Sequence, residues 1–218
     1  DLSARIVTTS PDVTVSTNLS GWVNAKGLFK SKEHLDAFNQ EKVLSPIKWE
    51  KKPLGQHIEL GIAENNLFLM LAAMGLSDQL FGERLIPVGT IYDTFISRGL
   101  DALNYACYQD ARFILVGTPS GITLAPEGGA HQSIATPLIG LSQDGLATFE
   151  PAFGDELGVI LEWSFGYIQK NSDGLLGKTW SRDEGGGSVY LRLSTRSIKQ
   201  PKRLFTPELR NGVIEGGY

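Results

Sequence analysis

The sequence predicts a single α/β domain built on a mainly parallel β-sheet with helices on both faces. Short β-branched or apolar segments alternate with helical patterns, and the connections between them are short, as in parallel sheets covered on both sides. Glycine accounts for 25 of the 218 residues, about 11% against a norm of roughly 7%, and the excess lies between predicted strands and helices. Ligands of such sheets bind beyond the carboxyl ends of the strands, so we expect these loops to surround a ligand.

A strand opens the predicted fold. Residues 5–9 are rich in β-branched side chains and precede Ser10-Pro11-Asp12, which predicts a strand that ends in a turn. Residues 17–52 are polar and weakly patterned, so we expect a long, partly irregular connection with a short helix at 32–38.

The middle of the chain alternates between helix and strand. An apolar run through Met74, rich in Leu, Met and Ala, predicts a buried helix that ends at Gly75. A short strand at 84–88, a helix over about 93–108 and a strand at 112–117 are predicted to follow.

The alternation continues after a Gly- and Pro-rich segment at 118–129. A short helix near 131–135 and a strand at 145–149 are predicted next. Apolar positions spaced by about 3.6 residues predict a helix at 155–169, and a polar, Gly-rich loop separates it from a last strand at 188–193.

A basic, proline-bearing tail follows Thr195. We interpret it as a linker that leaves the domain, so the predicted domain covers residues 1–195 and the linker covers residues 196–218.

Composition and charge narrow the classes of function. Hydrophobic residues make up 41% of a chain with net charge −4, which indicates a folded protein without the positive field that non-specific binding of DNA or RNA requires. The longest apolar stretch, 67–76, is far shorter than the roughly 18 residues of a membrane span. We therefore expect neither a nucleic-acid nor a membrane partner.

The first residues lack a secretory pattern and the single cysteine cannot form an internal disulfide, which favours a cytoplasmic setting.

Glu64 is the strongest candidate for a catalytic residue, because it stands where an apolar helix is predicted to begin. An exposed acid favoured by the helix dipole is the structural alternative. In the functional interpretation, an apolar surrounding disfavours the ionised carboxyl and suits it to share a proton with a ring nitrogen. Glu59, five residues earlier, is a weaker rival.

His131 is the histidine whose context favours a functional role. It ends a glycine-rich loop that opens a short predicted helix, although a surface histidine is the alternative. His34 lies in a polar segment and is expected to be solvated, and His57, near the Glu64 helix, stays ambiguous.

Two aromatic residues and the single cysteine are weaker candidates. Tyr92 and Phe95 are three residues apart where a strand turns into a helix, a spacing that puts both rings on the same face of the helix. The two rings are either part of the core or a platform on which a ligand stacks. Cys107 has no evident basic neighbour and is expected to be buried without a catalytic role. P-loop, zincin, zinc-ribbon and esterase motifs are absent from the sequence.

Three ordered segments carry a resemblance to a known family. Residues 55–65 (GQHIELGIAEN), 86–95 (IPVGTIYDTF) and 123–132 (TLAPEGGAHQ) resemble the central, pyrimidine-binding domain of thiamine-diphosphate enzymes. The pattern is most like that of the homodimeric pyruvate dehydrogenase decarboxylase component, with transketolase next. The resemblance spans about residues 5–195, and three motifs in order are far more specific than one.

The resemblance implies roles for four residues. The family glutamate that matches Glu64 hydrogen-bonds N1′ of the cofactor's aminopyrimidine and so promotes loss of the proton at thiazolium C2. Tyr92 and Phe95 would pack on the pyrimidine ring, and His131 would face the substrate or an oxyanion as donor or acid.

The chain departs from the family in lacking its diphosphate-binding motif. The nearest string, Gly154-Asp155-Glu156, is not the family's GDG-to-asparagine magnesium motif. The resemblance therefore implies that thiamine diphosphate is held partly elsewhere, with its diphosphate and Mg²⁺ on a domain outside this chain, and that no metal ligand lies within it. We interpret the chain as an excised central domain, inactive alone, that works with a diphosphate-binding domain across a homodimer.

The histidine loop leaves the substrate open. Thr123-Leu124 is dehydrogenase-like, whereas His131-Gln132 is transketolase-like. We expect oxidative decarboxylation of a 2-oxo acid such as pyruvate, in which a lipoyl-bearing acyltransferase is a possible partner. The alternatives are ketol transfer between sugar phosphates by a transketolase, and a non-catalytic α/β binding module.

Overall fold

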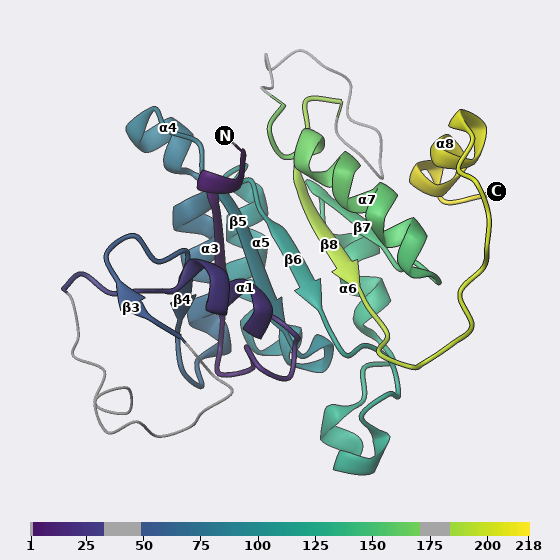
Figure 1. Ribbon diagram of the computed structural model, residues 1–218, viewed down its shortest axis with the longest axis horizontal. Coiled ribbons are helices and arrows are strands. Elements are labelled where there is room, and N and C mark those ends of the chain that lie inside the picture. Colours follow the sequence, from purple (N-terminus) through teal and green to yellow (C-terminus); the bar gives the residue numbers. More distant parts are fainter. Residues whose placement is uncertain (1, 33–48, 171–183) are drawn as a thin grey trace.

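The computed structural model describes residues 2–32, 49–170 and 184–218. Its centre is an eight-stranded sheet with the strand order β3-β2-β4-β1-β5-β6-β8-β7, in which every pairing is parallel (Figure 1). The strands are β1 (Ile6–Ser10), β2 (Leu28–Phe29), β3 (Lys51–Lys52), β4 (His57–Glu59), β5 (Ile86–Ile91), β6 (Ile114–Gly117), β7 (Leu146–Phe149) and β8 (Ser188–Arg192).

Helices follow or precede most strands, as the alternating sequence pattern predicts. The α-helices are α1 (Ser20–Lys26), α3 (Glu64–Gly75), α4 (Ser77–Phe81), α5 (Leu100–Tyr108), α6 (Thr136–Ser142), α7 (Gly154–Tyr167) and α8 (Pro207–Glu215). The 3₁₀-helices are η1 (Leu2–Ala4), η2 (Asp93–Gly99), η3 (Ala125–Glu127) and η4 (Gly129–His131). The predicted α/β fold with a parallel sheet is confirmed.

Both faces of the sheet are covered by helices. Phe113 and Leu115 of the β6 region pack with residues of α3 and α5, whereas Ile114 and Val116 pack with residues of α7. This alternation is the two-residue period of a strand that is buried on both faces. The apolar runs of the central strands are therefore core on both sides.

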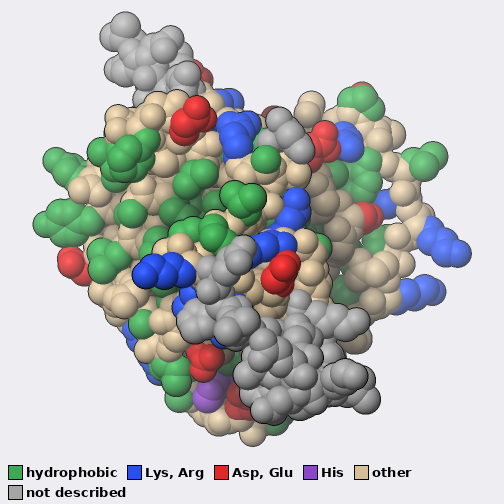
Figure 2. All heavy atoms as spheres, turned by 60° about the vertical axis from the view of Figure 1, so that its left-hand side comes forward, with side chains coloured by type: hydrophobic (Ala, Val, Ile, Leu, Met, Phe, Trp, Pro, Cys, Tyr) green, Lys and Arg blue, Asp and Glu red, His purple; other side chains and the backbone are tan. Residues whose placement is uncertain are grey.

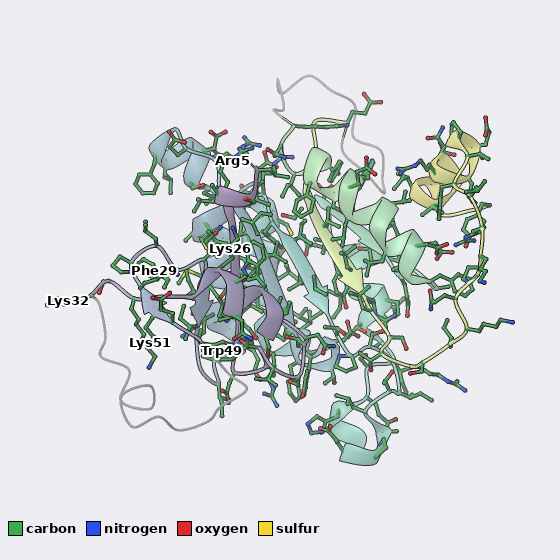
Figure 3. All side chains as sticks on the ribbon, viewed as in Figure 1. Arg5, Lys26, Phe29, Lys32, Trp49 and Lys51 are labelled. Carbon is green, nitrogen blue, oxygen red and sulfur yellow. The ribbon has the colours of Figure 1, made fainter. Side chains whose placement is uncertain are left out.

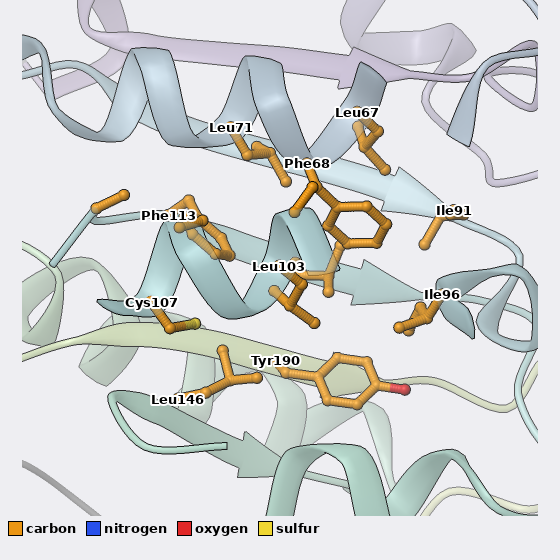
Figure 4. Packing of buried hydrophobic residues seen from close by; sticks show 14 of the residues in the cluster. Leu67, Phe68, Leu71, Ile91, Ile96, Leu103, Cys107, Phe113, Leu146 and Tyr190 are labelled. Atoms are coloured by element: carbon orange, nitrogen blue, oxygen red, sulfur yellow. The ribbon is translucent and has the colours of Figure 1, made fainter. Parts of the chain in front are cut away.

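The core on the α3 side lies directly behind the site described below. Phe68 is fully buried between sheet and helices, together with Leu103 and Tyr190 (Figure 4). Burial of side chains of this size contributes roughly 1.5–3 kcal/mol each to the free energy of unfolding. This cluster fixes α3, η2 and α5 against the sheet.

Several local predictions were confirmed. Strands lie at β1, β5, β6, β7 and β8, and the buried helix ends at Gly75 as predicted. The reason for the glycine differs from the expected left-handed cap, because a Cβ on Gly75 would lie 2.7 Å from the backbone nitrogen of Arg112. Close approach of two backbones, rather than positive φ, requires glycine here.

Other local predictions differ from the structure in type or position. The range predicted as one helix, 93–108, is helical throughout but divides into the 3₁₀-helix η2 and α5, whereas the helix predicted at 131–135 is replaced by η4 and, from Thr136, by α6. The connection predicted at 17–52 contains α1 and the short strands β2 and β3; the helix expected at 32–38 lies almost entirely outside the described residues. Strands β3 and β2 form one edge of the sheet, where Phe29 and Lys51 are labelled in Figure 3.

The segment after Thr195, expected to be a linker or tail, contains helix α8. Thr206 caps α8 by accepting a hydrogen bond from the backbone nitrogen of Leu209, and Val213 is buried against the α7 core. Arg203 forms ion pairs with Asp155 and Glu156 at the start of α7. The segment is thus docked on the domain beside α7 (Figure 1).

Candidate functional site

Three loops meet where neighbouring strands end. β4 ends at Glu59 and leads to α3, β5 ends at Ile91 and leads to η2, and β6 ends at Gly117 and leads to η3 and η4. Because β4, β1, β5 and β6 are consecutive in a parallel sheet, all three loops leave the same edge. This is the edge at which ligands bind in parallel α/β folds.

Glu64 begins α3 and is largely buried rather than solvated. Its side chain is 12% exposed, and its Oε1 accepts a hydrogen bond from Nη1 of Arg98 in an ion pair. Arg98 reaches Glu64 because α3 and η2 approach closely: a Cβ on Gly99 would lie 2.2 Å from Cδ2 of Phe68. The glycine thus sets the spacing between the carboxylate and η2.

Tyr92 and Phe95 form an aromatic pair at the start of η2. Their ring centroids are 5.8 Å apart with planes tilted by 33°. The guanidinium of Arg98 lies over the Phe95 ring, with Cζ 3.8 Å from the ring centroid. Tyr92, which precedes η2, and Phe95 and Arg98 within it therefore group two rings and a cation, and the cation pairs with Glu64.

His131 completes this cluster. Its ring packs edge-on against Phe95 and Tyr92, with centroids 5.5 and 6.3 Å away. Nε2 lies 3.7 Å from Oε2 of Glu127, whereas the buried Nδ1 has no hydrogen-bond partner among the residues described. A buried imidazole nitrogen without a partner needs an explanation, and a hydrogen bond to a bound molecule is one.

A second set of contacts ties the histidine loop to η2. The Thr94 hydroxyl lies within hydrogen-bond distance of the carbonyl oxygens of Ala130 and Gln132, at 3.3 and 3.1 Å, on either side of His131. The fully buried Asp93 accepts hydrogen bonds from the hydroxyls of Thr136 and Tyr190.

Burial and the Asp93 charge raise the pKa of Tyr190, which keeps its hydroxyl protonated as a donor. Through its hydrogen bond with Thr136, Asp93 also links η2 to the start of α6, which follows the histidine loop.

Glu59 and His57 belong to a different, structural network. The His57 ring is fully buried between Thr8 and Thr14, with Nδ1 2.8 Å and Nε2 3.0 Å from their hydroxyl oxygens. Partial burial opposes ionisation of Glu59, but hydrogen bonds from His57, Thr14 and the Asp12 backbone outweigh it and lower its pKa. Both groups bind β4 to β1 or to the turn that follows β1, and their polar atoms are satisfied.

The remaining candidates from the sequence are also placed. Cys107 is buried in the α5 core, and burial, with Asp144 and Asp110 nearby, raises the pKa of its thiol to about 12. His34 lies outside the described residues. Within the described ranges, no group of three or more His, Cys, Asp or Glu side chains is arranged to hold a metal ion, and no helix is long and apolar enough to cross a membrane.

Sequence reasoning missed Arg98, Thr94 and the Asp93–Arg192 pair. Arg98 stands three residues after Phe95, the same spacing that singled out Tyr92 and Phe95, and this spacing was a usable signal. The Asp93–Arg192 contact joins residues 99 positions apart, which no local pattern reveals.

Comparison with known proteins assigns the family. The sequence profile of the transketolase pyrimidine-binding domain matches residues 2–167. The chain belongs to this family. Its resemblance to the pyrimidine-binding domain of thiamine-diphosphate enzymes is therefore confirmed.

Two bacterial relatives show what this transketolase-type pyrimidine-binding domain resembles in sequence. It is 27% identical over 163 residues to the pyruvate dehydrogenase E1 component of Corynebacterium glutamicum, and this alignment covers 73% of this chain and 17% of that protein. It is 27% identical over 178 residues to the same component of Pseudomonas aeruginosa, and this alignment covers 79% of this chain and 20% of that protein. The chain thus spans about a fifth of the length of these relatives.

Solved transketolases share the fold of the domain. The transketolase from Leishmania mexicana superposes with a TM-score of 0.60 at 16% identity, over 87% of this chain and 22% of the transketolase. An inactive β4 tetramer of a split-gene transketolase gives a TM-score of 0.55 at 19% identity, over 94% of this chain and 48% of the other.

The residues of the pyrimidine-binding domain fit the group that its family implies. An aminopyrimidine is planar and carries ring nitrogens, so it needs an aromatic face and a carboxyl group. Phe95 and Tyr92 offer the face, and Glu64 offers a mostly buried carboxyl next to it. The orphaned Nδ1 of His131 lies at the same place.

Proposed function

We propose that this chain is the aminopyrimidine-binding part of an enzyme that uses thiamine diphosphate to decarboxylate a 2-oxo acid such as pyruvate oxidatively. The observation that carries the proposal is the meeting of Glu64, Tyr92, Phe95 and His131 at the carboxyl edge of the sheet. The family of the chain and its pyruvate dehydrogenase relatives support the same function.

Each residue has a role that its position supports. Thiamine diphosphate supplies, when bound, a thiazolium that accepts the electron pair released from the substrate. Glu64 would share a proton with N1′ of the aminopyrimidine, and Phe95 and Tyr92 would pack on that ring. His131, whose Nδ1 has no partner among the described residues, would serve the substrate as a hydrogen-bond donor or acid.

We infer that residues of another domain hold the diphosphate and Mg²⁺, because the sequence lacks the family's magnesium motif. The described part of this chain has no cluster suited to a metal ion. We infer that the partner is a diphosphate-binding domain, supplied across a homodimer, and that the whole enzyme works in the cytoplasm. A lipoyl-bearing acyltransferase would be a further partner of the dehydrogenase.

Exposed apolar side chains support a partner at this edge. Ile62 stands two residues before Glu64 and is 81% exposed, and Ile122 and Ile134 flank the histidine loop at 67% and 80% exposure. Other hydrophobic side chains are exposed among scattered charges on the face seen in Figure 2. Surfaces of this kind favour association, so we expect the chain to self-associate at high concentration. Light scattering that shows a monomer over a broad concentration range would contradict an interface here.

The decisive assay uses the full-length protein that contains this chain, with thiamine diphosphate and Mg²⁺. Reduction of an artificial electron acceptor that depends on pyruvate would support the dehydrogenase. Ketol transfer from xylulose 5-phosphate to ribose 5-phosphate, without the pyruvate reaction, would favour transketolase. Neither activity would direct the search to another 2-oxo acid or to a non-catalytic module.

Transketolase remains the second candidate because of one feature of the loop. Gln132 directly follows His131, the transketolase-like part of the motif, and its carbonyl oxygen accepts the Thr94 hydrogen bond. The two assays above, run side by side, separate the two reactions.

A further inference from the structure

Arg98 makes two contacts at once in the candidate site. Its guanidinium lies over Phe95, with Cζ 3.8 Å from the ring centroid, and its Nη1 donates to Oε1 of Glu64. These are the aromatic face and the carboxylate that the proposed function assigns to the aminopyrimidine. One side chain of the protein therefore uses both contacts that the cofactor needs.

The guanidinium is chemically suited to take the place of an aminopyrimidine. Both groups are planar and delocalised, both stack on aromatic rings, and both present N–H or N atoms to a carboxyl group in the plane. They cannot occupy the same space on Phe95 and the same oxygen of Glu64 together.

We propose that Arg98 is a placeholder that occupies the aminopyrimidine position in the cofactor-free protein and must move away before the cofactor binds. This inference rests on the proposed function. The device has a physical reason: Glu64 is only 12% exposed, and an unpartnered charged carboxylate is costly to bury. Arg98 satisfies that charge until the ring arrives.

The arginine is able to leave. Its side chain is 51% exposed, so water is available to solvate the released guanidinium. Ion pairs and cation–π contacts of exposed arginines are weak, and together they are expected to reduce the apparent affinity for a competing ring by about three- to tenfold.

Binding of the free ring tests the proposal without the diphosphate half of the site. The probe is 4-amino-5-hydroxymethyl-2-methylpyrimidine, titrated into the full-length protein by calorimetry or followed by saturation-transfer NMR. Arg98→Met is expected to bind the probe about three- to tenfold more tightly than the unmodified protein. Arg98→Lys, which keeps the charge but loses the planar fork, is expected to fall between the two.

Two controls sharpen the test. Arg210 on α8 is also half-exposed and paired with a glutamate, Glu162, so Arg210→Met matches the lost charge and is expected to leave probe binding unchanged. Added salt weakens the Arg98–Glu64 pair, so salt should tighten probe binding in the unmodified protein and not in Arg98→Met. Circular dichroism verifies that each variant is folded.

The outcomes separate the two proposals. Weaker or unchanged binding by a folded Arg98→Met, with binding still lost on Glu64→Gln, would overturn the placeholder and leave the proposed function in place. No binding by any variant, or binding that does not depend on Glu64, would overturn both.

Discussion

Nε of Arg192 lies 3.2 Å from Oδ2 of Asp93, and both side chains are almost fully buried. The same guanidinium donates to the carbonyl oxygen of Ser133 at 3.2 Å and pairs with Glu150. Burial opposes the charge of Arg192, but the Asp93 and Glu150 carboxylates outweigh it and raise its pKa. Since Asp93 lies between Tyr92 and Phe95 in sequence, this pair joins the aromatic side of the site to the histidine loop.

Loss of this pair should be costly. Arg192→Met leaves the Asp93 charge buried without its partner, so we expect the free energy of unfolding to fall by about 3–5 kcal/mol. Urea unfolding measures the change. Arg210→Met is the control, because its ion pair with Glu162 is exposed and should contribute less than about 1 kcal/mol. Equal effects of the two variants would contradict a stabilising role for the buried pair.

Glu64→Gln should abolish most activity without unfolding the protein. The amide keeps the shape of the side chain but cannot exchange a proton with a ring nitrogen, so we expect kcat of the full-length enzyme to fall by roughly 10²- to 10⁴-fold. Thermal unfolding should be nearly unchanged. Glu83→Gln, at an exposed position, is the matched control with full activity expected. Retained activity in Glu64→Gln would favour the non-catalytic module.

The two described histidines should respond to substitution in opposite ways. His131→Ala removes a group with a free nitrogen at the site, so kcat should fall by roughly 10²-fold while stability and cofactor affinity change little. His57→Ala removes one hydrogen bond from each of the Thr8 and Thr14 hydroxyls, so it should lower the free energy of unfolding by about 1–3 kcal/mol. Steady-state kinetics, calorimetry and urea unfolding of both variants distinguish the roles; a stability loss in His131→Ala alone would reverse the assignment.

Glu59 should make stability depend on acid pH. Its pKa is lowered from the ordinary value of 4.5 in the folded protein, so the folded state favours the ionised carboxyl. The stabilisation is complete above 4.5 and is lost as the pH falls through the lowered pKa. Urea unfolding at pH 7 and at decreasing acid pH should show the difference between the unmodified protein and Glu59→Gln shrinking with acid. A constant difference would show that Glu59 acts by packing alone.

Strong local patterns predicted most of the long elements. The apolar runs of β6 and β8 and the Leu- and Met-rich run of α3 are each long enough to identify the element without tertiary information. The strands β2 and β3 have two residues each, too few for a period, and are defined by their pairing.

Helices α6 and α8 each begin with a local signal in the sequence. Pro137 lies in the first turn of α6, and Thr206 with Pro207 forms the N-terminal cap and first residue of α8.

The sequence by itself determined the α/β class, the family resemblance and the four residues expected at the cofactor, because these depend on local periodicity and on ordered motifs. Only the tertiary structure decided that Arg98 pairs with Glu64 and that Arg192 reaches Asp93. These contacts join residues that are 34 and 99 positions apart. They exist because parallel strands bring the loops at their carboxyl ends to one edge of the sheet. The separation of two residues along the sequence does not indicate that their loops are in contact there.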